Sequence, residues 1–74
     1  MKLPSREQVE ALRREYPVGT LVELIHMDDV AAPPPGTIGE VVYVDDMCQL
    51  GVRWSNGSGL SLIPGVDSFR RVEK

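Results

Sequence analysis

An alternating stretch that ends in an Asn-Gly pair constrains the fold more than any other feature of this sequence. Residues 49–54 alternate between apolar and other side chains, and Asn56-Gly57 follows almost at once. Alternation of this kind predicts a strand with one buried face. The residues on that face are Leu50, Val52 and Trp54. Because both residues of an Asn-Gly pair tolerate positive φ, they indicate a type I′ hairpin and a return strand over Ser58 to Ile63.

Three further stretches rich in β-branched or aromatic residues predict strands on either side of this hairpin. They run over Leu21 to Met27, Glu40 to Val44 with a bulge near its start, and Phe69 to Val72. A 3₁₀ turn is expected at 64–67, and Leu60 is expected on the buried face. A chain of 74 residues holds a single core. The sequence therefore predicts an all-β fold, a small SH3-like five-stranded barrel over residues 16–74, preceded by an N-terminal α-helix within residues 1–15.

The predicted helix has recognisable start and stop signals. Ser5 followed by Gln8 has the form of a capping box, and Pro17 disfavours helical backbone at the residue before it, so the helix should end near Glu15. A helix of this length is marginal in water by itself. Its narrow apolar stripe consists of Val9, Leu12 and Tyr16. We expect this stripe to dock on the barrel, the alternative being an interface with a partner or with a second copy.

Three consecutive prolines, Pro33 to Pro35, follow the first predicted strand. Proline lacks a backbone N–H and favours polyproline II geometry, so this segment cannot be a central strand. We interpret it as a stiff, exposed loop, and keep open the alternative that it is a ligand for an SH3 or WW domain.

Charge and cysteine content limit the classes of function. The net charge is −3, and residues 16–68 carry one arginine against seven carboxylates, a net −6. An acidic body of this kind argues against nucleic-acid binding, because affinity for phosphate is built from Lys and Arg. The single Cys48 forms no internal disulfide or zinc knuckle, and no Lys, Arg or His lies beside it in the sequence to activate it, so we expect an inert thiol. With no apolar leader or membrane segment in the sequence, we expect a cytoplasmic protein.

Six residues are candidates for a binding surface: Tyr43, Trp54, Asp28, Asp29, Asp45 and Asp46. An exposed Trp or Tyr anchors peptides or bases, although Trp54 is also placed to pack in the core. The acidic pairs are equally typical of solvated turns. His26 with Asp28 and Asp29 has some metal-ligand character, but a catalytic metal site needs three ligands and a second shell. We predict no catalytic residue, no metal and no cofactor.

A succession of short motifs over residues 16–70 gives a further indication. In chain order they are Tyr16-Pro17-Val18-Gly19-Thr20, Val22-Glu23-Leu24-Ile25-His26-Met27, Ala32-Pro33-Pro34-Pro35-Gly36-Thr37, Gly39, Val44-Asp45-Asp46, Val52-Arg53-Trp54-Ser55-Asn56-Gly57-Ser58 and Ile63-Pro64-Gly65-Val66-Asp67-Ser68-Phe69. With them the chain resembles a small domain of unknown function that is scattered through bacterial genomes, phages and integrative mobile elements. The resemblance implies a small β-barrel and a mobile-element setting, and supplies no activity. Val30 and Met47-Cys48 depart from it where a Pro and a Gly are expected, which affects two turns.

These observations favour a protein-binding module over an enzyme. The chain has no Gly-rich phosphate loop, no nucleophile elbow and too little length for a deep cleft. The expected partner is another protein with a basic surface, steered to the acidic barrel, and one specific form is a phage or mobile-element accessory protein. The alternative is a nucleic-acid-binding SH3-like domain. Its possible contacts are Arg13, Arg14, Arg53, Arg70 and Arg71.

Overall fold

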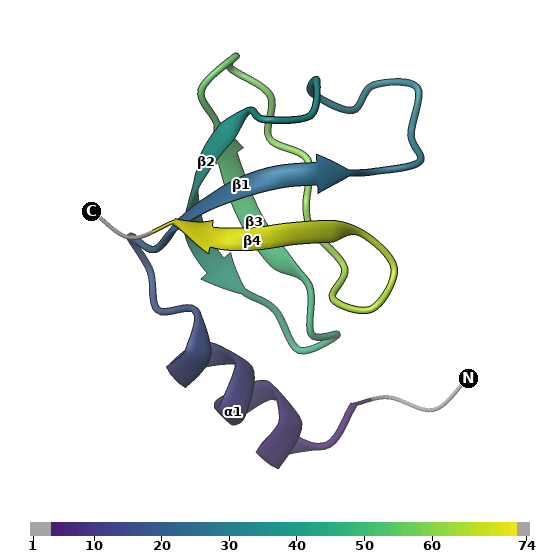
Figure 1. Ribbon diagram of the computed structural model, residues 1–74. Helices are drawn as coiled ribbons and strands as arrows, with labels where there is room; N and C mark the ends of the chain where they lie inside the picture. The colour runs from purple at the N-terminus through teal and green to yellow at the C-terminus, as the bar shows by residue number, and fades with distance from the viewer. Residues whose placement is uncertain (1–3, 73–74) are drawn as a thin grey trace.

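The computed structural model describes residues 4–72 and contains one helix and a four-stranded antiparallel sheet (Figure 1). Residues 1–3 and 73–74 of the predicted helix and barrel ranges lie outside this description. The strands are ordered β3-β2-β1-β4 across the sheet. In chain order the elements are α1 (Arg6–Glu15), β1 (Leu21–His26), β2 (Ile38–Val44), β3 (Leu50–Trp54) and β4 (Ser68–Val72).

The prediction of five strands is wrong, because the expected fourth strand is reduced to a single bridge. Leu50 and Leu62 exchange two backbone hydrogen bonds, of 2.9 and 2.8 Å, and the rest of residues 58–63 is not in the ladder. The indole N–H of Trp54 donates to the carbonyl of Leu60 at 2.9 Å. This carbonyl therefore bonds to a side chain, whereas in a fourth strand it would bond to the backbone of β3. The sheet of the described residues therefore does not close.

The turn after β3 also differs from the predicted type I′ geometry. Gly57 has φ +91, whereas Asn56 is not among the residues with positive φ. The N–H of Gly57 donates to the carbonyl of Trp54, and the N–H of Trp54 donates to Ser58, both at 2.9 Å. This pattern is a three-residue loop in which a left-handed glycine follows a tight turn. At 64–67, where a 3₁₀ turn is predicted, the chain forms a hydrogen-bonded turn in which the N–H of Val66 donates to the carbonyl of Ile63 at 3.0 Å.

The bulge in β2 lies in the middle of the strand instead of near its start. The register against β3 shifts between Val41 and Tyr43. One extra residue breaks the alternation of faces. As a result Val41 and Val44 are both buried, while Val42 and Tyr43 are both exposed.

The core lies under the sheet, and the predicted alternation on β3 is confirmed. Leu60 is partly buried against the same cluster. Gly39 lies beneath this packing, since a Cβ there would be 2.4 Å from Val52 Cγ1 and 2.7 Å from Trp54 Cε3. Only a residue without a side chain lets the Trp54 ring approach β2 so closely. The buried residues are Val9, Val22, Leu24, Val41, Val44, Leu50, Val52, Trp54 and Leu62.

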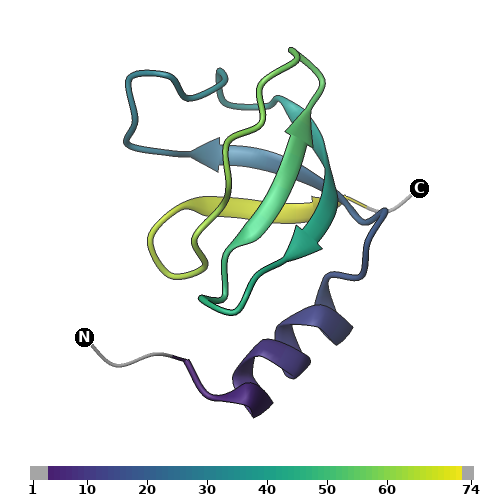
Figure 2. The same ribbon diagram turned by 180° about the vertical axis from the view of Figure 1, so that it is seen from behind.

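The helix prediction is confirmed, including its cap. The Ser5 hydroxyl accepts from the Gln8 N–H at 3.1 Å, and the Gln8 side chain accepts from the Ser5 N–H at 2.8 Å. The helix lies at one end of the sheet, beside the β2–β3 turn (Figure 2). Val9 is buried there, and the rings of Tyr16 and Phe69 meet at 5.6 Å. The apolar stripe thus docks on the domain's own sheet.

The proline run forms a loop anchored to β1. Pro33 is buried, the carbonyl of Pro34 accepts from the Thr37 hydroxyl at 2.6 Å, and the Gly36 N–H donates to Leu24 at 2.7 Å. Only Pro34 and Pro35 are exposed. These contacts support the interpretation of a stiffened loop, with Pro33 facing inward instead of toward a partner.

Candidate functional site: an apolar groove beside the helix

A groove of about 650 Å³ separates one flank of α1 from the rest of the domain. The helix, the β2–β3 turn and the turn before β4 each contribute two apolar residues to it. Met47 and Ile63 remain 40% and 38% exposed there. The six residues are Ala11, Leu12, Met47, Cys48, Ile63 and Pro64, and the rim is completed by Pro4, Gln8 and Glu15. The groove is therefore an open, largely apolar surface with one carboxylate at its edge.

The β2–β3 turn is folded so that two apolar residues face the groove. Asp45 Oδ1 accepts from the N–H groups of Met47 and Gln49, both at 2.9 Å. Cys48 takes φ +59, a left-handed conformation that favours glycine. The motif pattern leads one to expect a glycine at Met47-Cys48, and Cys48 adopts a backbone conformation that glycine favours while adding a thiol to the groove wall.

The turn before β4 is fixed by its own hydrogen bonds. Asp67 Oδ2 accepts from the Ile63 N–H at 2.8 Å, and the Asp67 N–H donates to the Ile63 carbonyl at 2.9 Å. With Leu62 bridged to β3, these bonds hold Ile63 and Pro64 at the surface. The apolar side chains of this turn are thus presented by a defined backbone.

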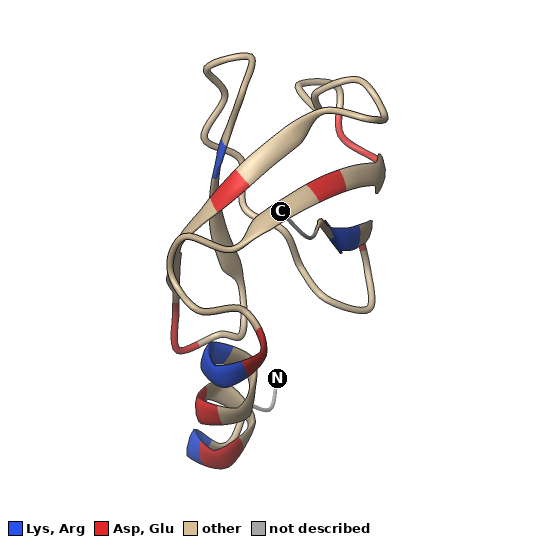
Figure 3. Ribbon diagram, turned by 60° about the vertical axis from the view of Figure 1, so that its left-hand side comes forward, with Lys and Arg blue, Asp and Glu red and all other residues tan. Residues whose placement is uncertain are grey.

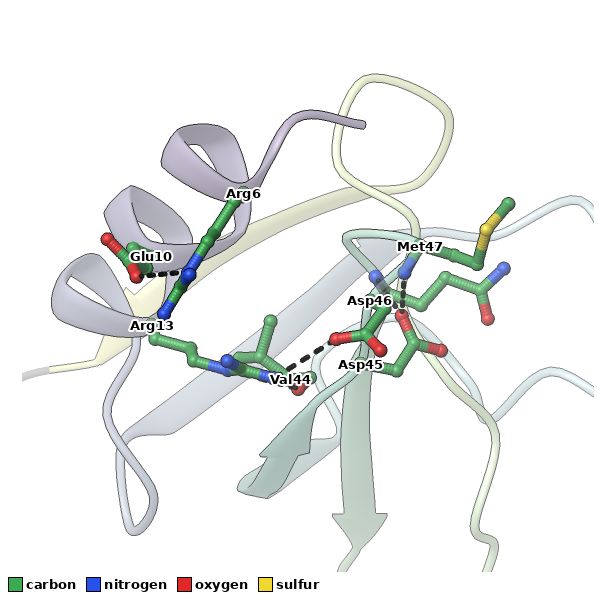
Figure 4. A network of polar contacts seen from close by, with 8 residues as sticks. Arg6, Glu10, Arg13, Val44, Asp45, Asp46 and Met47 are labelled. Carbon is green, nitrogen blue, oxygen red and sulfur yellow. Dashed lines mark hydrogen bonds and ion pairs between the residues drawn. The ribbon is translucent and has the colours of Figure 1, made fainter. Parts of the chain in front are cut away.

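The opposite flank of α1 is polar (Figure 4). Arg13 donates to the Val44 carbonyl at 3.0 and 3.3 Å and lies 3.6 Å from Asp46. Arg6 pairs with Glu10 at 3.2 Å. Both ion pairs are exposed and contribute little stability, whereas the bond to Val44 ties the helix to β2. The helix therefore has a polar flank, on which Arg6 and Arg13 have partners within the domain, and an apolar flank that is open to solvent.

The two predicted aromatic candidates have different environments. Trp54 is 1% exposed, its N–H is occupied by Leu60, and it offers no surface to a ligand. Tyr43 is 50% exposed and covers Gly51, whose missing Cβ would lie 2.2 Å from the ring. Tyr43 lies with Arg13, Tyr16 and neighbouring residues around a second, smaller hollow on the polar side of the helix.

The two acidic pairs are separated by the sheet. In the antiparallel pairing of β1 with β2, the loop after β1 and the turn after β2 fall at opposite ends. Asp29 Oδ1 accepts from the Ala31 N–H at 2.8 Å, which makes it a local turn acceptor like Asp45. Asp28 and Asp46 are exposed, and so is His26. Within residues 4–72 no three His, Cys, Asp or Glu side chains gather in a way that could hold a metal ion.

The candidate arginines do not form one free basic face (Figure 3). Arg53 lies 3.7 Å from Glu40, and Arg70 lies 2.6 Å from Glu23 across the outer face of the sheet. Arg71 donates to the Glu15 carbonyl at 2.9 Å. Their charges are interspersed with carboxylates, as Figure 3 shows along the helix and the strands.

Tyr16 lies at the end of the helix and is partly buried. Burial, together with the neighbouring Glu15 carboxylate, raises the pKa of its hydroxyl above the ordinary value, and Arg71 partly opposes this effect. Tyr16 is thus uncharged at neutral pH and acts as a packing residue between α1 and β4.

Fold and groove together define a small domain of one antiparallel sheet and one helix, with an open apolar groove between them. The chain belongs to the family described as a domain of unknown function (DUF4314), whose model matches residues 5–72. No curated protein and no solved structure was found to match it. Among residues 4–72 no helix is long and apolar enough to cross a membrane.

The groove residues were missed by reasoning from the sequence. Ala11, Met47 and Ile63 are far apart in the chain and none of them belongs to a chemical motif. The available signal was the presence of apolar residues in turns, at Met47 and at Ile63-Pro64, where no strand or helix requires them.

Proposed function

We propose that this domain is a protein-interaction module that holds an apolar segment of another protein in the groove beside α1. The observation that carries the proposal is the groove itself, with apolar residues from three separate segments left open to solvent. Concave, mostly apolar surfaces with few polar groups are the usual form of a binding site. The mobile-element setting is proposed on the motif resemblance alone.

The rim of the groove suggests the chemistry of the partner segment. Glu15 is the one charged residue that lines it, and the domain as a whole is acidic. A segment that combines apolar residues with a basic one would fill the groove and meet Glu15. Because Glu15 is exposed, this pairing adds selectivity more than affinity.

Binding is supported over catalysis and over nucleic-acid recognition by how the polar side chains are used. Asp29, Asp45 and Asp67 accept hydrogen bonds from the backbone of their own turns. Arg53 and Arg70 are each paired with a carboxylate. Groups committed in this way are poorly placed to contact phosphates or to transfer protons.

The test uses peptides selected from a displayed random library against the full chain. Binding of the selected peptides is then measured by calorimetry for wild type, Ala11→Glu and Ala31→Glu. Both alanines are exposed, but only Ala11 lines the groove. We expect Ala11→Glu to weaken binding by roughly tenfold or more, because it places a charge in an apolar contact, and Ala31→Glu to leave it unchanged. Peptides that bind both variants equally would contradict the groove as the site.

A further inference from the structure

The loop after β3 carries the one asparagine of the sequence, Asn56, and a glycine follows it directly. Both residues are exposed, and no heavy atom lies within 4 Å of the place where Gly57 would carry a Cβ. The loop lies at the end of the sheet away from α1 (Figure 2), and none of its residues lines the groove. Because glycine has no side chain, its backbone nitrogen can closely approach the side chain that precedes it. The pair therefore has the chemistry for a reaction between its own backbone and its own side chain.

This reaction consumes only water. The Gly57 nitrogen gives up its proton to hydroxide and forms a bond to Cγ of Asn56. The bond from Cγ to Nδ2 breaks, and Nδ2 takes a proton from water and leaves as ammonia. Water then opens the resulting cyclic imide at one of its two carbonyl carbons. Breaking the bond from Cγ to nitrogen gives aspartate, whereas breaking the bond from the main-chain carbonyl carbon to nitrogen gives isoaspartate, in which the main chain runs through Cγ.

Two hydrogen bonds of the folded loop oppose the attack. The Gly57 N–H donates to the Trp54 carbonyl at 2.9 Å, which keeps the proton on the nitrogen that must react. Asn56 Oδ1 accepts from the Ser58 N–H at 2.9 Å, which directs the side-chain amide toward Ser58. Both bonds must break before the Gly57 nitrogen meets Cγ. Since each bond of this kind shifts an equilibrium by about tenfold or less, the closed loop should slow the reaction roughly tenfold to a hundredfold.

We propose that Asn56 is a site of spontaneous deamidation, that the reaction starts from a locally open form of loop 55–57, and that only the aspartate product fits the closed loop. Aspartate keeps an oxygen at the position of Asn56 Oδ1. Two other turns of the domain already use aspartate in this way. Asp29 accepts from the N–H two residues ahead at 2.8 Å, and Asp45 does so at 2.9 Å. An aspartate at position 56 therefore preserves the contact to Ser58.

Isoaspartate changes the loop itself. It adds a methylene group to the main chain, and the oxygen that accepts from Ser58 becomes part of the main-chain carbonyl. The bond from the Gly57 N–H to the Trp54 carbonyl would then have to close a longer ring. The Trp54 N–H donates to the Ser58 carbonyl across the same loop at 2.9 Å. The isoaspartate form should therefore lose these bonds and leave the Trp54 backbone N–H less protected from solvent.

Mass spectrometry of the intact full chain tests the site. The chain is incubated at neutral pH, folded in buffer or unfolded in guanidinium chloride, and the small mass increase from amide to acid is followed. Asn56 is the only asparagine and no aspartate precedes a glycine, so isoaspartate arises here. Isoaspartate is measured by methyl transfer from S-adenosylmethionine with an isoaspartyl methyltransferase. We expect both products, formed roughly tenfold to a hundredfold more slowly in the folded chain. Equal rates, or a folded rate more than about a thousandfold lower, overturn the proposal.

Val9→Ala separates local opening from global unfolding. Val9 is buried under the helix, far from the loop, so this variant should raise the globally unfolded fraction roughly tenfold, as measured by denaturation. A reaction that starts from the locally open loop keeps its wild-type rate in this variant. A reaction that starts from the unfolded chain accelerates by the same factor as the unfolded fraction, and this result overturns the proposal.

The last measurement compares the two products. Isoaspartate chains are separated by chromatography and compared with freshly prepared Asn56→Asp, which has the same composition without the altered main chain. Amide exchange at the Trp54 backbone N–H is followed by NMR. We expect Asn56→Asp to stay within about threefold of wild type and the isoaspartate form to exchange roughly tenfold faster or more. Equal exchange in the two forms overturns the claim that only aspartate fits the loop.

Discussion

The interior of the sheet and the junction between helix and sheet are packed to very different degrees. Leu24, Leu50 and Trp54 are at most 1% exposed, and their neighbours in the core are similarly enclosed. From the helix only Val9 is buried, while Leu12 remains partly exposed along the groove. The free energy of folding should therefore come mainly from the sheet, and the proposed binding site lies at the junction, where fewer side chains are buried.

The largest expected difference between the two regions comes from one substitution made in each. Leu50→Ala removes a fully enclosed side chain and should lower the free energy of unfolding by about 3 kcal/mol. Leu12→Ala removes a half-buried one and should cost about 1 kcal/mol. Urea denaturation of both variants measures the difference. Equal losses would mean that the helix junction is as closely packed as the sheet.

Alanine substitutions at two glycines of the sheet give a second comparison between an enclosed and a half-exposed environment. Gly39→Ala places a Cβ 2.4 Å from Val52 Cγ1, inside the core, and should cost about 2 kcal/mol. Gly51→Ala places one 2.2 Å from Tyr43, whose half-exposed ring can turn away, so the loss should be below about 1 kcal/mol. The same denaturation experiment applies, and the reverse ranking would contradict the packing described for Trp54.

Removing the helix cap tests how much the junction between helix and sheet contributes to the stability of the domain. Ser5→Ala removes the hydroxyl that accepts from Gln8 and should destabilise the domain by about 1 kcal/mol. Ser55→Ala, an exposed serine in the turn after β3, serves as the control and should change little. If thermal denaturation gives the same melting temperature for Ser5→Ala and wild type, the helix does not contribute to the cooperative unit.

The smallest expected effect is at Cys48, on the groove wall. Its φ of +59 strains any residue with a side chain, so Cys48→Gly should be more stable than Cys48→Ala by about 0.5–1 kcal/mol. The comparison with alanine removes the thiol from both variants and isolates the backbone term. An alanine variant at least as stable as the glycine variant would argue against the left-handed turn.

Local signals in the sequence predicted those parts of the fold that neighbouring residues determine. Ser5 with Gln8 sets the start of the helix, and the alternation of Leu50, Val52 and Trp54 sets the buried face of β3. The return strand was mispredicted because its outcome depends on a contact six residues apart, from the Trp54 indole to the Leu60 carbonyl. No property of the Asn-Gly pair encodes that contact.

The candidate site was less predictable than the fold for a related reason. Reasoning from residue type selected aromatic and acidic side chains, and the fold separates these residues or assigns them to its own turns. The groove arises where three segments, near Ala11, Met47 and Ile63, meet in space. Their apolar side chains have no distinctive chemistry, and only the tertiary arrangement brings them together.

The contact between Trp54 and Leu60 also provides a built-in optical signal. Trp54 is the only tryptophan of the chain, it is enclosed, and its indole N–H is bonded to the segment that crosses β3. Emission from such an indole is blue-shifted and moves to longer wavelength when water reaches the ring. Intrinsic fluorescence should thus follow detachment of residues 58–62 from the sheet without any added label, and would separate this local opening from loss of the helix, which leaves the indole covered.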